Sequence, residues 1–310
     1  MLGIWLGAGF SKWASDLPLA NQLFDFKISP FGAKEATKTI KVARTKRNWD
    51  AENPDAPAEK FIADALTRHD INKELVLWYI VRRLSEPFIW VDKYAFGKRR
   101  HVLMVDENRK FEIEGVRKAQ SFISNIRALK RVSGIVTTNY DLLIEYALGT
   151  QGYNYGIKGQ RLNGRGAYPV SQWIKPVILS GNISIAKIHG SLSWDEKGYY
   201  TDGRRGLTGN ALIVAPTPEK EPSKLLKFHW GLAKQILKST SDLIVFGFAF
   251  NPYDQAVLNL LKSAGNNIRR VLLVDISPKT DLTKTLWPQA EILTSLPPPE
   301  GQEVISNWLK

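Results

Sequence analysis

Cysteine is absent from this chain of 310 residues. Disulfide bonds and thiolate zinc sites are therefore excluded, because both need cysteine sulfur. The four histidines are scattered singly, so the ligand spacing of an ordinary metal site is missing as well. We expect a protein without a bound metal, and the lack of cysteine fits a cytoplasmic location.

Long apolar runs are also missing. No segment reaches the roughly 20 apolar residues that a helix needs to cross a bilayer. The first apolar segment, residues 2–6, is short, follows no basic stretch and runs directly into glycines, unlike a secretory signal. We therefore expect no signal segment and no membrane association.

Acidic residues are scarce relative to basic ones. Aspartate and glutamate number 30 against 43 lysines and arginines, which gives a net charge of +13. Such a surplus favours anionic partners: nucleic acid, nucleotides or an acidic protein. The stretch Lys34–Arg47 is the best candidate for a nucleic-acid contact, although no basic run is as long as a nucleic-acid-binding tail. A solvated surface is the alternative, and only true phosphate contacts would weaken with added salt.

Apolar segments of strand length alternate with amphipathic segments of helical period, most regularly in the second half of the chain. The expected strands are residues 2–6, 134–138, 183–188, 211–215, 242–248 and 270–276. The expected helices are residues 16–26, 58–84, 116–130, 142–148, 225–237, 253–264 and 303–309. This alternation is typical of an α/β fold, and we predict a Rossmann-like, doubly wound, mostly parallel sheet.

The segment between the first two expected strands is much longer than an ordinary crossover. We predict one Rossmann-type domain formed by residues 1–26 and 131–310, with residues 27–130 inserted as a mainly helical subdomain. Within the insertion, the ambiguous residues 88–115 fit a hairpin that turns near Asp106–Asn108. Residues 149–182 are rich in Gly, Asn and Pro and are expected to form a long excursion or lid.

Glycines and polar residues stand at the ends of five expected strands. The five segments are Gly7–Ser11, Thr137–Asp141, Ile188–Ser191, Gly247–Asp254 and Val274–Asp275. Ligands of open α/β sheets bind beyond the carboxyl ends of the strands, so we expect these segments to form one site.

The first segment suits phosphate groups. The turn of Gly7, Ala8 and Gly9 lets a phosphate approach the backbone, and the start of the next helix stabilises negative charge. Ser11 can add a hydroxyl hydrogen bond. An ordinary strand-to-helix turn would look the same, and an incomplete dinucleotide fingerprint is a weak signal.

The later segments supply groups for ribose and for acid–base chemistry. Asn139 offers a donor and an acceptor for a ribose hydroxyl or a water molecule, and His189 can act as a general base. Asn251 and Asp275 suit a ligand such as ribose. Against this, Asp141 and Asn251 also suit helix caps, a solvated carboxylate would explain Asp275, and a lone histidine is more often structural.

Taken together, the segments GAGFS, TTNYD, KIHGSLSW, IVFGFAFNPYD and LLVDISP, in this order, resemble the sirtuin superfamily. The chain is most similar to the bacterial sirtuin-like NAD hydrolases that are associated with antiphage defence. TTNYD followed by KIHGS is fairly specific as a pair, and GFAFNPYD strengthens it. The resemblance covers both chain ends and the middle but leaves residues 27–130 and 149–182 unmatched.

The resemblance implies a role for each matching residue. Two residues would be catalytic: Asn139 would position the nicotinamide ribose or the attacking water, and His189 would be the general base that acts on a ribose hydroxyl. The phosphates of NAD would be held by Gly7, Ala8, Gly9 and Ser11. Asp141 would support the pocket. The adenosine half would be lined by Gly247, Asn251 and Asp275. Family members often carry serine where this chain has Ala249, so a hydrogen bond from a serine hydroxyl is not expected at this position.

One departure separates the branches of the superfamily. Sirtuin deacylases carry a zinc module held by four cysteines, which helps to build the acyl-peptide cleft, and this chain has no cysteine. The resemblance therefore implies a zinc-independent NAD glycohydrolase, which converts NAD and water to nicotinamide and ADP-ribose or its cyclic form. A deacylase is the least favoured enzyme.

Unregulated cleavage of NAD would harm the host cell. We therefore expect a regulated effector of antiviral defence that stays inactive until it assembles into an oligomer or is triggered. The alternative is a non-catalytic subunit that binds NAD or ADP-ribose and controls a partner ATPase or an Argonaute-type protein. Both hypotheses place NAD at the same strand ends, and only the first needs chemistry from Asn139 and His189.

Overall fold

The computed structural model of the protein describes residues 1–26, 33–85, 90–95, 98–103, 110–149, 152–157, 167–169, 175–178, 182–195, 198–200, 211–214 and 224–310. Its main sheet has seven strands in the order β14-β13-β12-β1-β4-β7-β5, and all neighbouring strands run parallel. The strands are β1 (Leu2–Leu6), β4 (Val132–Thr137), β5 (Tyr153–Asn154), β7 (Ile183–Lys187), β12 (Asp242–Phe246), β13 (Arg270–Val274) and β14 (Glu291–Ser295). The predicted Rossmann-like α/β class is confirmed.

The direction of winding reverses at β1. Strands β4 and β7 lie on one side of β1, whereas β12, β13 and β14 lie on the other. The loops that follow β1 and β12 therefore meet where the connections diverge, and ligands of doubly wound sheets bind at such a switch point.

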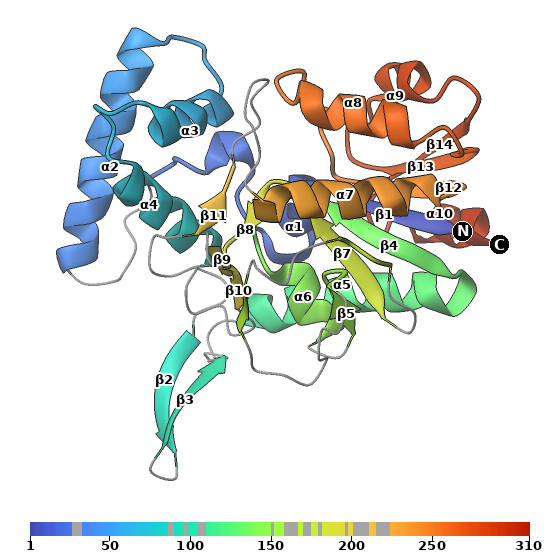
Figure 1. Cartoon of the computed structure of the whole chain (residues 1–310), viewed down its shortest axis with the longest axis horizontal. Coiled ribbons are helices and arrows are strands. Elements are labelled where there is room, and N and C mark those ends of the chain that lie inside the picture. The colour runs from blue at the N-terminus through green and yellow to red at the C-terminus, as the bar shows by residue number, and fades with distance from the viewer. Residues whose placement is uncertain are drawn as a thin grey trace.

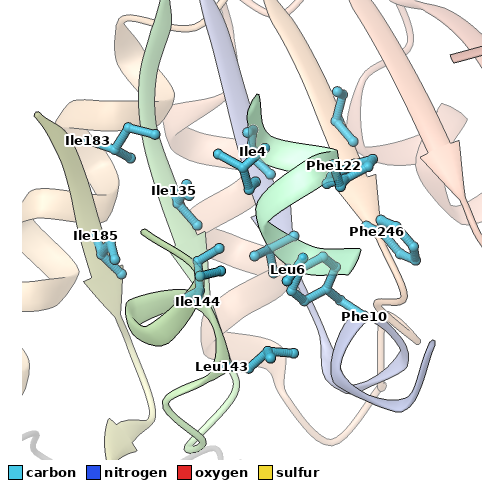
Figure 2. Packing of buried hydrophobic residues seen from close by; sticks show 14 of the residues in the cluster. Ile4, Leu6, Phe10, Phe122, Ile135, Leu143, Ile144, Ile183, Ile185 and Phe246 are labelled. Carbon is cyan, nitrogen blue, oxygen red and sulfur yellow. The ribbon is translucent and has the colours of Figure 1, made fainter. Parts of the chain in front are cut away.

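Helices cover both faces of the sheet. One face is covered by α1 (Ala8–Ser15), α5 (Lys110–Leu129), α6 (Leu143–Leu148) and α10 (Gln302–Leu309). The other is covered by α7 (Lys224–Lys238), α8 (Gln255–Ala264) and α9 (Thr280–Leu286). Successive side chains of a strand point to opposite faces, so Ile4 and Leu6 enter the first cluster and Trp5 enters the second. Figure 2 shows Ile4 and Leu6 beside Phe10 of α1 and Phe122 of α5.

A helical block lies beside the sheet, at the left of Figure 1. We use this name for α2 (Ala33–Glu52), α3 (Ala58–Thr67) and α4 (Lys73–Ser85). Its apolar residues, among them Trp49, Phe61 and Ile80, belong to a third cluster that also includes Leu192 and Ile213. The basic stretch that was the candidate nucleic-acid contact lies largely on α2.

The remaining strands that the structure describes form three small sheets. β2 (Trp90–Ala95) and β3 (Lys98–Leu103) form a hairpin that projects away from the rest of the molecule (Figure 1). β6 (Ala167–Pro169), β10 (Gly198–Tyr200) and β9 (Trp194–Asp195) form a three-stranded sheet, and β8 (Gly190–Ser191) pairs with β11 (Leu212–Ile213). Most of the predicted excursion at 149–182 lies outside the described residues.

Helix α5 falls within the predicted insertion but packs on the main sheet. Its Ala119, Phe122 and Ile123 share a cluster with Ile4 and Leu6 of β1. Its packing therefore differs from that of the helical block, and the domain division at 27–130 stays a prediction.

Several predicted elements were misplaced. The first helix was expected at 16–26, but α1 begins at Ala8, and only a short 3-10 helix, η1 (Ala20–Gln22), follows. Asp16 ends α1 because it adopts a left-handed conformation (φ 52°) and donates its amide to the Lys12 carbonyl. The helix predicted at 58–84 is two helices, since the backbone of Arg68 is extended.

Two further predictions need correction. The hairpin turns between Ala95 and Lys98, earlier than Asp106–Asn108, and those three residues lie outside the described ranges. Helix α9 (Thr280–Leu286) lies where no helix was predicted. Among the described residues, no helix is both long and apolar enough to cross a bilayer, and no three His, Asp or Glu side chains gather as a metal site would require.

Candidate functional site

The glycine turn after β1 packs directly against the loop after β12. The Gly7 amide donates to the Phe246 carbonyl (2.9 Å), and the Gly9 amide donates to the Gly247 carbonyl (2.8 Å). A Cβ on Gly7 would lie 2.4 Å from the Gly247 oxygen, and one on Gly9 would lie 2.6 Å from the Gly247 Cα. Three predicted glycines are thus needed for one backbone-to-backbone contact at the switch point. Ala8, the first residue of α1, is exposed above it.

Asn139 connects this turn to the end of β4. Its Nδ2 donates to the Gly7 carbonyl (2.9 Å) and to the Ser11 hydroxyl oxygen (3.0 Å). The Ser11 hydroxyl donates in turn to the Asp141 carboxylate (2.8 Å). The structure therefore brings Gly7, Ser11, Asn139 and Asp141 together in one hydrogen-bonded network.

Asp141 has two partners that explain its burial. One carboxylate oxygen accepts from Ser11, and the other accepts from the amide of Leu143 (3.0 Å), at the start of α6. Only 6% of the residue is exposed. Asp141 thus both supports the network and satisfies a free amide of the helix start, so the two sequence interpretations are compatible.

His189 follows β7, and its partner is Asp254. The His189 Nε2 lies 2.9 Å from the Asp254 carboxylate, and both side chains are less than 10% exposed. Gly190 comes next with φ +94°, and its pairing with β11 leaves no room for a Cβ, which would lie 2.0 Å from the Leu212 oxygen. In the sequence, Asp254 stands out only as the last residue of the segment Gly247–Asp254. Its position at the end of GFAFNPYD gave no sign that it contacts the histidine of KIHGS.

Tyr140, between Asn139 and Asp141, lies close to His189. The two rings are 6.4 Å apart, and the Tyr140 hydroxyl donates to the Val214 carbonyl (3.0 Å). Burial raises the pKa of Tyr140 above its usual value of 10, and the negative charges of Asp254 and Glu59 raise it further. Tyr140 is therefore a neutral hydrogen-bond donor across the physiological pH range.

Asn251 and Asp275 are the predicted residues with the loosest connection to the rest. The Asn251 side chain donates to Glu59 of α3 (3.0 Å) and accepts from the Tyr253 amide (3.0 Å). Asp275 accepts from the Ser277 amide (2.8 Å). Within the described ranges, no hydrogen bond or ion pair joins Asp275 to the other predicted site residues, so its assignment to the adenosine half stays a prediction.

A buried charged pair lies beneath the network, and the sequence interpretation missed it. Lys187 donates to the backbone carbonyl of Asp141 and forms an ion pair with Glu145 (3.0 Å). Tyr155 donates its hydroxyl to the same Glu145 oxygen (2.7 Å). A single lysine in the otherwise apolar run ISIAK was the available signal.

These groups pack closely around a narrow space that has no room for a water molecule; it is lined by Leu6, Phe10, Ser11, Thr137, Asn139, Asp141, Ile144 and Lys187. Pockets for whole small ligands measure roughly 300–1,000 Å³, so side chains would have to move before a ligand could enter here. A larger groove of about 770 Å³ lies between α7 and α8, and none of the predicted site residues lines it. We call Gly7, Gly9, Ser11, Asn139, Asp141, His189, Gly247 and Asp254 the strand-end site.

Comparisons with known proteins identify one family. The model of the SIR2-like domain matches residues 133–291, a range that includes Asn139, His189 and Asp254 and leaves out Gly7 to Ser11 and the helical block. No match to a curated protein sequence was found.

Three solved structures illustrate the similarity. A structure from a study of the mechanism and regulation of Sir2 enzymes is 12% identical, with a TM-score of 0.45, over 99% of this chain and 90% of that chain. A mutant Sir2 homologue in complex with ADP-ribose is 14% identical, with a TM-score of 0.42 over the same shares. A Sir2 homologue in complex with NAD is 13% identical, with a TM-score of 0.38, over 99% of this chain and 87% of that chain.

Proposed function

The chain belongs to the SIR2-like domain family, and from this premise we propose that it is a zinc-independent NAD glycohydrolase. One observation supports this activity above others. The Asn139 amide is bonded to the glycine turn, and the His189–Asp254 pair stands at the end of the next strand. The residues that we propose as phosphate cradle, positioning group and general base thus follow neighbouring strands at one edge of the sheet.

The glycine turn is the proposed binding element for the two phosphates. Helix α1 begins at the exposed Ala8, so its amino-terminal dipole favours an anion there. The Gly7 and Gly9 amides donate to the end of β12 and the loop after it, and the Ser11 hydroxyl donates to Asp141, so Ser11 would have to turn away from Asp141 to donate to a phosphate. Asn251 and Asp275 are proposed to line the adenosine half.

In the proposed reaction, the bond between ribose C1′ and the nicotinamide nitrogen breaks, and nicotinamide leaves with the bonding electron pair. The oxygen of water forms the new bond to C1′, and the proton of that water is released. Asn139 would hold the ribose or the attacking water. The site stabilises the ribosyl cation mainly by preorganised polar groups and by orientation, so no metal is needed.

The pairing with Asp254 determines which nitrogen of His189 can act as the base. An ionised carboxylate only accepts hydrogen bonds, so Nε2 carries the proton in the His189–Asp254 contact. The lone pair of the neutral ring is then on Nδ1, which is the proposed base for a ribose hydroxyl. Asp254 fixes this tautomer, much as a buried carboxylate does in other histidine-dependent enzymes.

The test is incubation with NAD followed by chromatography of nicotinamide, ADP-ribose and cyclic ADP-ribose. We expect His189→Ala and Asn139→Ala to reduce kcat by about 100-fold or more, which is typical for loss of a general base or a positioning group. His69→Ala and Asn266→Ala are matched controls, because both residues are exposed and neither belongs to the strand-end site. NAD that remains intact under every activating condition would refute the hydrolase.

The cellular role belongs to the same proposal. We propose a regulated effector of bacterial antiphage defence, active as an oligomer or with a partner ATPase or Argonaute-type protein. The side-chain nitrogen of Asn139 donates to both Gly7 and Ser11, and the space beside it has no room for a water molecule, which is consistent with a resting state. Phage plating on cells that carry the wild-type or His189→Ala gene tests this role, and equal protection by both would favour the non-catalytic subunit instead.

A further inference from the structure

The helical block packs on the two segments that flank the general base. Leu192, three residues after His189, and Ile213 of β11 belong to the same apolar cluster as Phe61 and Ile62 of α3. Tyr140 packs against this cluster from the other side, and its carbonyl accepts from the Leu192 amide (3.0 Å). The block is therefore in contact with the strand-end site, although the matched family region begins only at residue 133.

One polar side chain of the block enters this contact. The Glu59 carboxylate, near the start of α3, accepts from the Asn251 side-chain amide at 3.0 Å across 192 residues of sequence. The Asn251 carbonyl accepts the Asp254 amide (2.9 Å), and the Asp254 carboxylate holds His189. A chain of three hydrogen bonds thus runs from the helical block to the imidazole of the proposed base.

The backbone between these residues needs such support. Phe250, next to Asn251, has φ +50°, a left-handed conformation that is unfavourable for a residue with a side chain. Asn251 uses its other side-chain atom to accept the Tyr253 amide. Glu59 therefore holds Asn251, whose side chain accepts a hydrogen bond from this turn. Among the described residues, Glu59 forms no ion pair with a lysine or arginine that would compete with Asn251.

We propose that Glu59 is a positioning residue of the active site: it fixes Asn251, and thereby the turn that presents Asp254 to His189. The helical block would then contribute to the geometry of the active site. The test of this inference by kcat rests on the proposed hydrolase activity, whereas its test by hydrogen–deuterium exchange does not.

The first experiment follows the turn itself. Hydrogen–deuterium exchange of the segment 250–255 is measured in the wild type, in Glu59→Ala and in the control Glu74→Ala, whose side chain is exposed on α4. We expect exchange in this distant segment to become about 10-fold faster in Glu59→Ala only, because the Tyr253 and Asp254 amides lose a fixed acceptor. Unchanged exchange in Glu59→Ala would overturn the proposal, whether or not the protein hydrolyses NAD.

The second experiment uses a reversal of the hydrogen bond. Asn251→Asp places two carboxylates against each other, and the double variant Glu59→Gln with Asn251→Asp restores the bond with the donor on the other side. We expect Asn251→Asp and Glu59→Ala to lower kcat about 10-fold, with little change in the melting temperature. The double variant should recover most of the lost rate.

The outcomes separate the two hypotheses. A wild type without activity would refute the hydrolase, and the exchange experiment would still decide the role of Glu59. A second outcome is an active wild type, with faster hydrogen–deuterium exchange at 250–255 in Glu59→Ala but an unchanged kcat. That result would leave Glu59 as a structural contact and would refute its role in catalysis. If the kcat of the double variant does not exceed that of Asn251→Asp, the hydrogen bond between Glu59 and Asn251 is refuted as the cause of the lost rate.

Discussion

At the scale of single residues, Lys187 connects the segments that carry Asn139 and His189. It precedes His189 by two positions on β7, and its ammonium group binds the carbonyl of Asp141, two positions after Asn139. The side chain is only 1% exposed, and its charge is balanced by Glu145. A buried ion pair adds little net stability, but loss of one partner leaves an uncompensated charge in the core.

We predict that Lys187→Met destabilises the fold by about 3–5 kcal/mol, because among the described residues the Glu145 carboxylate would keep the Tyr155 hydroxyl but no positive charge. The double variant Lys187→Met with Glu145→Leu should recover most of this loss, since apolar residues can replace a buried pair at little cost. Urea denaturation gives both values, with the exposed Lys262→Met as the control. A single variant within about 1 kcal/mol of the wild type would contradict the prediction.

The sequence allowed some of these residues to be identified but not others. Asn139 and His189 could be proposed from the sequence because each follows a β-branched or apolar strand, where ligands gather, and their roles stay predictions. Lys187 left a weak local signal, a charge in an apolar strand. Glu59 left none, because its meaning depends on a contact with Asn251 that only the tertiary fold creates.

At the scale of secondary-structure elements, the contact between the β1–α1 turn and the β12–α8 loop positions the site. Gly247 has φ +62°, and a Cβ there would lie 2.3 Å from the Phe10 amide nitrogen. Gly149, after α6, has a similar φ of +68° but nothing within 4 Å of an added Cβ. Alanine at these two positions therefore compares a site with a steric clash to a site without one.

We predict that Gly149→Ala costs about 1–3 kcal/mol, the backbone strain of an alanine at φ 68° and ψ 166° without a steric clash. Gly247→Ala should cost at least about 2 kcal/mol more, because the backbone of the glycine turn has to move. It should also weaken binding of NAD, measured by calorimetry, whereas Gly149→Ala should not. Equal losses of stability in the two variants would show that the turn accommodates the methyl group without difficulty.

The period of the apolar residues and the spacing of the apolar runs predicted the main elements well. The buried parallel strands are short apolar runs, and they alternate with amphipathic helices. The start of α1 was missed for a physical reason. The glycines were read as a loop, yet Gly7 is the N-cap and Ala8 already begins the helix. Likewise, Leu282 and Leu286 of α9 are too few in a helix of seven residues to produce a clear period.

At the scale of the whole molecule, stability should depend on pH through a histidine that the proposed reaction does not use. His229 of α7 is fully buried, stacks on Trp194 (4.2 Å) and accepts the Lys187 backbone amide on Nδ1 (3.2 Å). Burial, together with the positive charge of Lys187, holds the pKa of His229 well below its usual value of 6.5. The folded protein thus keeps this ring neutral in mild acid.

The unfolded chain binds a proton at His229 below pH 6.5, whereas the folded chain does not, so the free energy of unfolding should fall as the pH falls through this value. Each pH unit below 6.5 should cost about 1.4 kcal/mol from this residue. His229→Gln should be less stable at pH 7, because the ring packing is lost, yet its stability should fall less steeply between pH 6.5 and 5. Urea midpoints at pH 7, 6 and 5 measure both slopes. His69→Gln, at an exposed position, serves as the control, and parallel slopes for the wild type and His229→Gln would show that another group causes the acid sensitivity.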